Sequence, residues 1–213
     1  MRNWYYFNWL CGDHIVEQHV HNIDIANWIT GHHPVSVQGT GSRAWRTGKD
    51  YGEIYDNHAT EFTYPNGVVV YSQCRHFEGT NNRIDETFQG TKGRVYLSGG
   101  NQAILYDAKG NEIYNHNTKG NANPYQTEHD ELFEAISKGE FKCTDADYGA
   151  TSSFSGIMGR YATYSGQTIK WDEALAANNS LLPERLAWDA SPRVLPDENG
   201  LYPIPMPGKT KVL

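Results

Sequence analysis

The sequence predicts an α+β fold in which helices cover one face of a large, mostly antiparallel sheet. Three observations support this class. Apolar residues near the N-terminus have helical spacing, seven segments rich in strand-forming residues follow, and helical spacing returns after Pro124. With 213 residues the chain is long enough for a sizeable core, so we expect one domain over residues 1–213.

The first predicted helix begins at Asp13 and ends near Thr30. Its apolar side chains fall on one side of a helical wheel, and these are Ile15, Val16, Val20, Ile23 and Ala26. Asp13 suits the N-cap position, because its carboxylate can accept a free backbone N–H, and Gly31 suits the position after the last turn. Aromatic residues crowd the segment before this helix, RNWYYFNWL, and need a surface on which to pack.

The central part of the chain is predicted to form strands. The segments are VSVQGTGSRAW, GEIYDNHATEFTY, GVVVYSQCRHF, RIDETFQG, RVYLSG, QAILYD and EIYNHN. Three of the links between them, at residues 65–67, 90–93 and 107–111, are hairpin-sized and rich in turn residues. Because links this short join only antiparallel neighbours, the sheet is expected to be antiparallel.

Helical spacing returns in residues 126–139, 145–166 and 171–179. In the first of these segments we expect Leu132, Phe133 and Ile136 to point inward. Residues 182–213 hold most of the nine prolines, so we expect an extended, irregular tail.

The composition excludes several classes of protein. The formal net charge is -7 and the sequence pI is about 5.7, without the clustered Lys and Arg needed to bind nucleic acid or an anionic membrane surface. There is no run of about 18 apolar residues and no signal-peptide pattern, so we expect a soluble chain without a targeting segment. Three cysteines, Cys11, Cys74 and Cys143, are too few for a disulfide framework and are expected to be buried small side chains or free thiols.

Histidines are concentrated in the first predicted helix, in GDHIVEQHVHN at residues 12–22. On a helical wheel His14, Glu17, His21 and Asp24 lie on one side, away from the apolar stripe. His19 falls among the apolar residues, and we expect it to be a packed, hydrogen-bonded core histidine.

Three interpretations of this polar line remain open from the residues alone. It can be an exposed helix face with an ordinary i, i+4 pair. It can be a metal site of a hydrolase or lyase, built from His14, Glu17 and His21, because imidazole and carboxylate are common zinc and iron ligands. It can also be an acid/base site, in which His21 takes a proton from a substrate hydroxyl while Glu17 orients the ring and another group accepts the hydride.

The motifs resemble a known family. GDHIVEQHVHNIDIANWITG, YGEIYDNHATEFTYPNG, GTKG, NPYQTEHDELFEAISKGE and GIMGRYATYSGQTIKWDEAL are similar to the C-terminal domain of Gfo/Idh/MocA oxidoreductases, such as glucose-fructose oxidoreductase and inositol dehydrogenase. The resemblance covers nearly the whole chain. It implies an enzyme that oxidises a hydroxyl of a sugar, an inositol or a glycoside.

The resemblance also implies roles for single residues. His21 falls at the position of the family's catalytic histidine and Glu17 at the position of the aspartate that precedes it. Asn22 and Asp24 follow where the family has two acids, so this chain departs from the pattern by a longer acid at 17 and an amide at 22. His14 and Asp24 are expected to contact the substrate.

Further candidates stand at strand ends, on a strand face or at a helix start: Arg75, His76, Asp56, His58, Tyr125 and His129. The strand residues either line a sugar pocket or form salt bridges and hydrogen bonds with their neighbours. Tyr125 and His129, in a family-like PY..EH segment, either approach the site or cap the helix.

In the family, NAD or NADP is bound by a separate N-terminal Rossmann domain. This sequence contains no glycine-rich phosphate-binding motif, so we expect no dinucleotide to bind to the chain alone. The resemblance further implies a homo-oligomer formed through the uncovered sheet face, and related full-length proteins are often exported in bacteria. The alternatives are a stand-alone binding or dimerisation domain, and the metal-dependent hydrolase or lyase.

Overall fold

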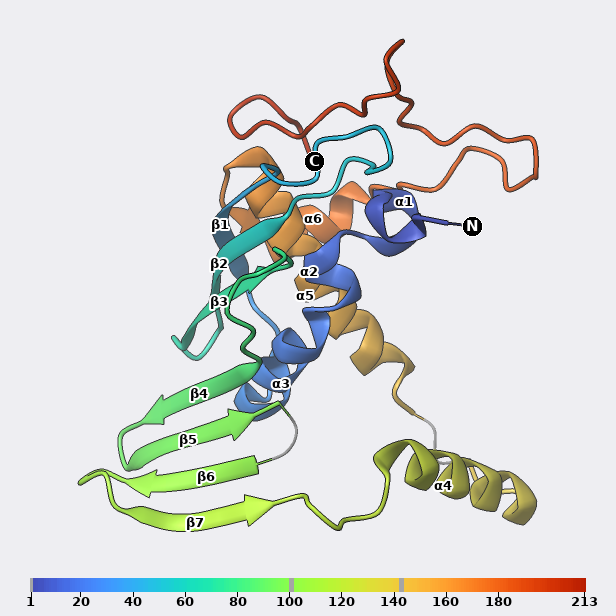
Figure 1. Cartoon of the computed structure of the whole chain (residues 1–213). Helices are drawn as coiled ribbons and strands as arrows, with labels where there is room; N and C mark the ends of the chain where they lie inside the picture. The colour runs from blue at the N-terminus through green and yellow to red at the C-terminus, as the bar shows by residue number, and fades with distance from the viewer. Residues whose placement is uncertain (1, 100–101, 142–143) are drawn as a thin grey trace. The chain divides into compact units, whose positions relative to one another are not determined.

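The computed structural model describes residues 2–99, 102–141 and 144–213 (Figure 1). The α+β class and the antiparallel pairing are confirmed, and the strands form two four-stranded sheets. The chain divides into two compact units, Met1–Glu78 with Tyr148–Leu213, and Gly79–Asp147. Cys11 and Cys74 are free thiols, whereas Cys143 lies outside the described residues.

The first unit contains one sheet and most of the helices. Its helical elements are η1 (Trp4–Tyr6), α1 (Asn8–Cys11), α2 (His14–Glu17), α3 (Val20–Thr30), most of α5 (Ala146–Ser165) and α6 (Trp171–Ala177). Its strands are β1 (Ser36–Ser42), β2 (Asn57–Thr63), β3 (Val69–Arg75) and β8 (Ile169–Lys170), in the order β3-β2-β1-β8. The link at residues 65–67 joins β2 to β3 as an antiparallel hairpin, as predicted.

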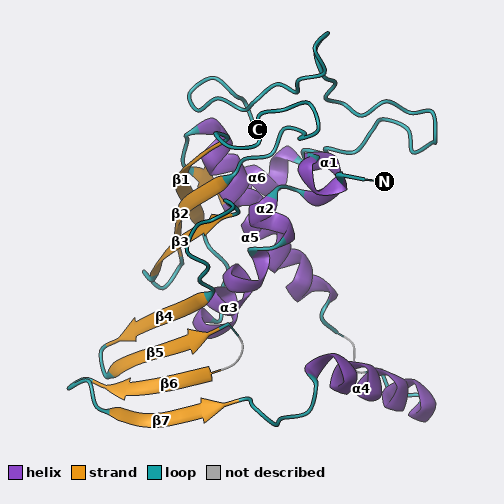
Figure 2. Cartoon of the chain, viewed as in Figure 1, coloured by secondary structure: helices purple, strands orange, loops and turns teal. Residues whose placement is uncertain are grey.

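Helices cover one face of this sheet (Figure 2). Val37 and Phe62 on the inner face share a buried core with Ile15 from α2 and Met158 from α5. Strand alternation places Gln38, Thr40, Ala59, Tyr71 and Gln73 on the exposed outer face. Gly159 lets α5 pack closely against α2, because a Cβ added at this position would lie 2.7 Å from Ile15 Cδ1.

The predicted first helix is interrupted between α2 and α3. The His19 N–H donates to the His14 carbonyl, five residues earlier, at 3.1 Å, which is a wide turn often found at functional sites. Both predicted ends are confirmed, since Asp13 accepts the His14 N–H and Gly31 ends α3 with φ 69°. The break rotates the residues after Gln18 relative to those before it, so the polar line of a single helix is not preserved.

The aromatic segment before α2 packs within the first unit. The Tyr6 ring meets Tyr51 edge-on at 4.9 Å between centroids, and Phe7 meets Tyr202 at 5.3 Å. Tyr202 belongs to residues 182–213, all of which are described and contain neither helix nor strand. This tail is therefore part of the surface on which the aromatic residues pack.

The second unit contains β4 (Asp85–Gly90), β5 (Gly93–Ser98), β6 (Gln102–Asp107), β7 (Glu112–Asn117) and α4 (Pro124–Lys138). Its strands pair in sequence order and are all antiparallel, as the hairpin links predict. The expectation that the apolar side of α4 points inward is wrong, since Leu132 is 40% exposed and Phe133 and Ile136 are each 63% exposed. None of the helices in the described part of the chain combines the length and apolar character needed to cross a membrane.

Candidate functional site

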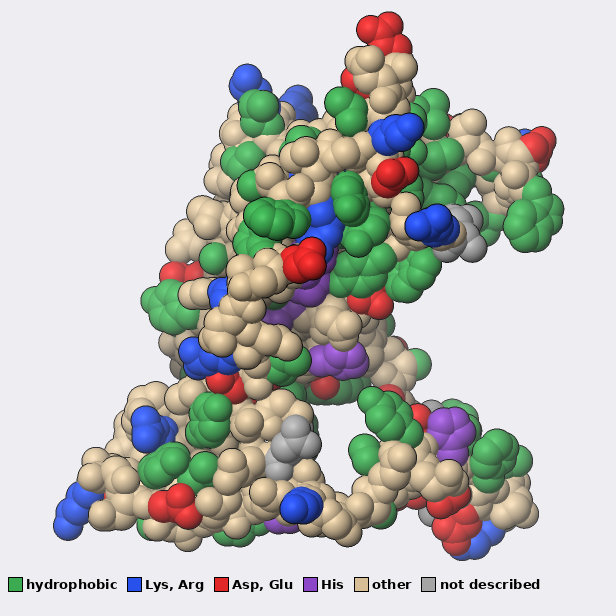
Figure 3. Space-filling model, viewed as in Figure 1, with side chains coloured by type: hydrophobic (Ala, Val, Ile, Leu, Met, Phe, Trp, Pro, Cys, Tyr) green, Lys and Arg blue, Asp and Glu red, His purple; other side chains and the backbone are tan. Residues whose placement is uncertain are grey.

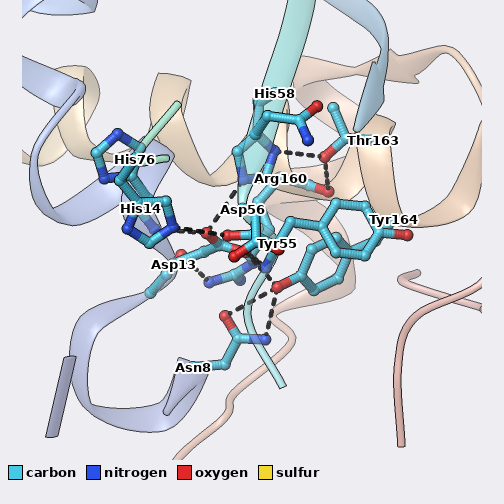
Figure 4. Close-up of polar contacts among 12 residues, drawn as sticks. Asn8, Asp13, His14, Tyr55, Asp56, His58, His76, Arg160, Thr163 and Tyr164 are labelled. Atoms are coloured by element: carbon cyan, nitrogen blue, oxygen red, sulfur yellow. Dashed lines mark hydrogen bonds and ion pairs between the residues drawn. The ribbon is translucent and has the colours of Figure 1, made fainter. Parts of the chain in front are cut away.

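Three rings from separate segments meet at the start of α2. The imidazoles of His14 and His76 stack with centroids 4.4 Å apart and planes 10° apart (Figure 4). The Tyr5 hydroxyl lies 2.6 Å from His14 Nδ1, and the Tyr5 ring lies 5.9 Å from the His76 ring. The structure thus brings together two predicted substrate-binding residues, His14 and His76, and adds Tyr5, which the sequence analysis did not single out.

Glu17 lies beside the same rings. Burial and then the negative charge of the nearby Glu17 carboxylate raise the pKa of Tyr5 well above its usual value. Glu17 Oε2 is buried and has no hydrogen-bond partner among the described residues. We call Tyr5, His14, Glu17 and His76 the His–Tyr cluster.

The histidines of this cluster are neutral near pH 7. Burial, together with the neighbouring His76, lowers the pKa of His14 to about 3. Burial and then the positive charge of Arg46 lower the pKa of His76. A group with so low a pKa is a weak base, so His14 is suited to bind a hydroxyl by hydrogen bonding rather than to remove its proton.

His21, the predicted base, lies in the first turn of α3 and is exposed. Glu17 ends α2, so the helix break lies between it and His21, and within the described part of the chain no hydrogen bond or ion pair joins the two side chains. Histidine side chains reach the surface over α2 and α3 on the face of the first unit seen in Figure 3. Asp24, one turn after His21, accepts the Ser152 hydroxyl at 2.6 Å and so ties α3 to α5.

The remaining predicted site residues are Arg75 in the first unit and Tyr125 and His129 in the second. Arg75 ends β3, is exposed, and alternates with the inward-facing Cys74. Tyr125 and His129 lie on α4 in the second unit, where the Tyr125 carbonyl oxygen is 2.6 Å from His129 Nδ1. His19 is partly buried and is hydrogen-bonded to the Ser72 hydroxyl at 2.6 Å.

The Asp13 side chain forms a hydrogen-bond network next to the cluster. Its fully buried carboxylate lies 3.1 Å from His58 Nε2 and accepts the Tyr55 N–H at 2.9 Å, the Tyr164 hydroxyl and the His14 N–H (Figure 4). Burial by itself would raise the pKa of this carboxyl, but the interaction with His58 and the other donors hold it below its usual value. The sequence predicted Asp13 only as an N-cap.

His58, on β2, continues this network inward. Thr163 donates its hydroxyl to the Arg160 carbonyl oxygen at 3.0 Å, so it accepts the His58 Nδ1–H at 2.9 Å. Asp13 itself has φ 80°, a conformation that costs a residue other than glycine about 1–3 kcal/mol. The network overcomes this strain, and it fixes the backbone from which the His14 ring projects.

The described residues do not assemble a metal centre. Across residues 2–99, 102–141 and 144–213, no group of three or more His, Cys, Asp or Glu side chains could hold a metal ion. The predicted trio of His14, Glu17 and His21 is divided by the helix break.

The fold is similar to that of several solved oxidoreductase structures. Aldose-aldose oxidoreductase from Caulobacter crescentus, solved with glycerol, is 20% identical with a TM-score of 0.66, covering 80% of this chain and 51% of that one. UDP-N-acetylglucosamine 3-dehydrogenase from Acidithiobacillus ferrooxidans is 16% identical with a TM-score of 0.58, covering 73% and 49%. Myo-inositol 2-dehydrogenase from Lactobacillus plantarum is 14% identical with a TM-score of 0.56, covering 75% and 48%.

Residues 1–96 match the family model described as the GFO/IDH/MocA C-terminal domain. The resemblance to this family is therefore confirmed, and the matched range contains the His–Tyr cluster, His21 and Asp24. The chain spans about half the length of the solved structures that it matches. No curated protein sequence matches the chain significantly.

Proposed function

We propose that this chain is the substrate-binding and proton-transferring part of an NAD(P)-dependent oxidoreductase that acts on a hydroxyl of a sugar, an inositol or a glycoside. The observation that carries the proposal is the His–Tyr cluster inside the range that matches the family. It offers two neutral imidazoles and a phenol within a few ångströms of each other, next to a carboxylate oxygen without a partner. Such a set of donors and acceptors suits a polyhydroxylated molecule.

The roles divide by burial. His14 is buried, His76 is partly buried, and their lowered pKa values make both weak bases, so they bind and orient the substrate hydroxyls together with Tyr5. His21 is the exposed imidazole of the motif and takes the proton from the reacting hydroxyl, with Asp24 fixing α3 against α5. Arg75, Tyr125 and His129 stay candidate substrate contacts.

The dinucleotide does not fit this chain, because the sequence offers no glycine-rich turn between a strand and a helix to cradle its phosphates. NAD or NADP would accept the hydride and would be held outside these residues, in the complete enzyme.

The proposal is tested by measuring the binding of glucose and myo-inositol to the 213-residue chain by NMR or calorimetry. We expect millimolar binding that His14→Ala weakens at least tenfold. The matched control His32→Ala, at an exposed position after α3, should bind like the unaltered chain. Binding that is equal in both variants, or micromolar binding of NAD to this chain, would contradict the proposal.

The outer face of the first sheet is proposed as a homo-oligomer interface. Tyr71 on this face is 77% exposed and Val69 is 41% exposed, which is unusual for large side chains in the middle and at the start of a strand. The Tyr71→Glu change should shift the chain toward the monomer, as measured by analytical sedimentation. An unaltered chain that is already monomeric at high concentration would argue against the interface.

A further inference from the structure

A cavity of about 300 Å³ lies in the first unit, apart from the His–Tyr cluster. Its walls come from α1, α5, the link between β1 and β2, and the irregular residues after α6, and neither His14, His21 nor His76 lines it. The tail is anchored on both sides of the cavity, since the Tyr55 hydroxyl donates to the Pro205 carbonyl oxygen at 2.7 Å and the Asn179 side chain to that of Val212 at 2.9 Å. The tail segments that border the cavity are thus held in place by hydrogen bonds.

One wall carries a buried carboxylate with a free oxygen. Glu53 is only 5% exposed, and its Oε1 accepts the Asn8 N–H at 3.0 Å. Its Oε2 is buried and has no hydrogen-bond partner among the described residues. Leaving a buried acceptor unpaired is unfavourable, so a ligand that donates a hydrogen bond to Oε2 would be stabilised there.

The charged side chains around the cavity restrict the charge of a ligand that could bind there. Arg160, which is 4% exposed and donates to the Gly12 carbonyl oxygen at 2.9 Å, also lines the cavity, as do Arg193 and Lys211. An ammonium group near Glu53 would therefore face several cations, and an anion would face the Glu53 carboxyl.

We propose that this cavity binds a small uncharged alcohol whose hydroxyl donates a hydrogen bond to Glu53 Oε2 and whose apolar body packs against the tail. The apolar part of the wall includes Trp9, Val194 and Ile204, which suit a hydrocarbon ring. This site is independent of the oxidoreductase function proposed above, because the two share no residue.

Two probes of nearly equal shape test the hydrogen bond. Cyclohexanol can donate to Oε2, whereas cyclohexanone can only accept. Ligand-observed NMR titration of the 213-residue chain should show roughly tenfold tighter binding of cyclohexanol, as expected for a hydrogen bond to a carboxylate. In Glu53→Gln the amide oxygen can still accept the Asn8 N–H, so an N–H donor replaces Oε2 and the preference should reverse toward cyclohexanone.

A second pair of variants tests the location without changing Glu53. Val194→Trp should fill the cavity and abolish binding of cyclohexanol. Leu195→Trp is the matched control, because Leu195 is the next tail residue, is 57% exposed and does not line the cavity. The proposal is overturned if neither probe binds, if the preference is the same in Glu53→Gln, or if the two tryptophan variants bind alike.

Discussion

The stacked rings of His14 and His76 join the first residue of α2 to the residue that follows β3, with 4.4 Å between centroids and 10° between planes. Two imidazolium ions could not stack this closely without repulsion. The contact therefore requires that at least one ring stays neutral, and burial lowers the pKa of both. It follows that the site is sensitive to acid.

The first prediction concerns that sensitivity. The folded-state pKa of His14 is about 3, below the unfolded value of about 6.5, so the unfolded chain binds more protons between these values. The contribution of the neutral, buried His14 ring to the free energy of unfolding is therefore complete above about pH 6.5 and is lost as the pH falls toward 3. Urea unfolding between pH 7 and pH 4 should show a loss of up to about 1.4 kcal/mol per pH unit from this residue, and His14→Gln should have a shallower dependence. Equal slopes for both chains would contradict the pKa assignment.

Tyr5→Phe should lower the free energy of unfolding by about 1–2 kcal/mol. The substitution keeps the ring but removes the hydroxyl that lies 2.6 Å from His14 Nδ1, and so leaves a buried ring nitrogen without its partner. Chemical denaturation measures the change. Tyr125→Phe is the control, because Tyr125 is 74% exposed, and it should change the stability by less than about 0.5 kcal/mol.

Asp13→Asn should destabilise the chain by about 3–5 kcal/mol. The fully buried carboxylate accepts from Tyr55, Tyr164 and His14 and is paired with His58, and an amide cannot replace all of these acceptor positions. The exposed Asp50→Asn change removes the same charge and should be nearly neutral. Similar midpoints for the two variants in denaturant would mean that the Asp13 network does not stabilise the fold.

Two glycine-to-alanine changes should act in opposite directions. At Gly52 a Cβ would overlap the Tyr6 carbonyl oxygen and lie 2.9 Å from Phe7 Cδ1, so Gly52→Ala should cost about 1–3 kcal/mol. At Gly149, inside α5, nothing lies within 4 Å, so Gly149→Ala should stabilise by about 0.5–1 kcal/mol. Thermal melting of the two variants measures both effects. A Gly52→Ala chain as stable as the unaltered chain would show that the close approach of the Tyr6 carbonyl to residue 52 is not required.

Local features of the fold were predictable because their causes are local. The hairpins at 65–67, 90–93 and 107–111 follow from turn residues between β-forming segments, and they enforce antiparallel pairing. The caps at Asp13 and Gly31 follow from side-chain and backbone chemistry within one turn. The break after α2 was not predictable, because the apolar spacing of a single helix continues across it.

The sequence by itself determined the α+β class, the antiparallel strands and the family resemblance, and it drew attention to His14, Glu17, His21 and His76. Only the tertiary structure decided that His14 and His76 stack, that Tyr5 completes their cluster, and that Asp13 is a buried centre of hydrogen bonds rather than a simple cap. The physical reason is distance along the chain: Tyr5, Asp13, His58, His76 and Tyr164 carry no shared spacing. Burial and pKa arise only when folding removes such side chains from water together.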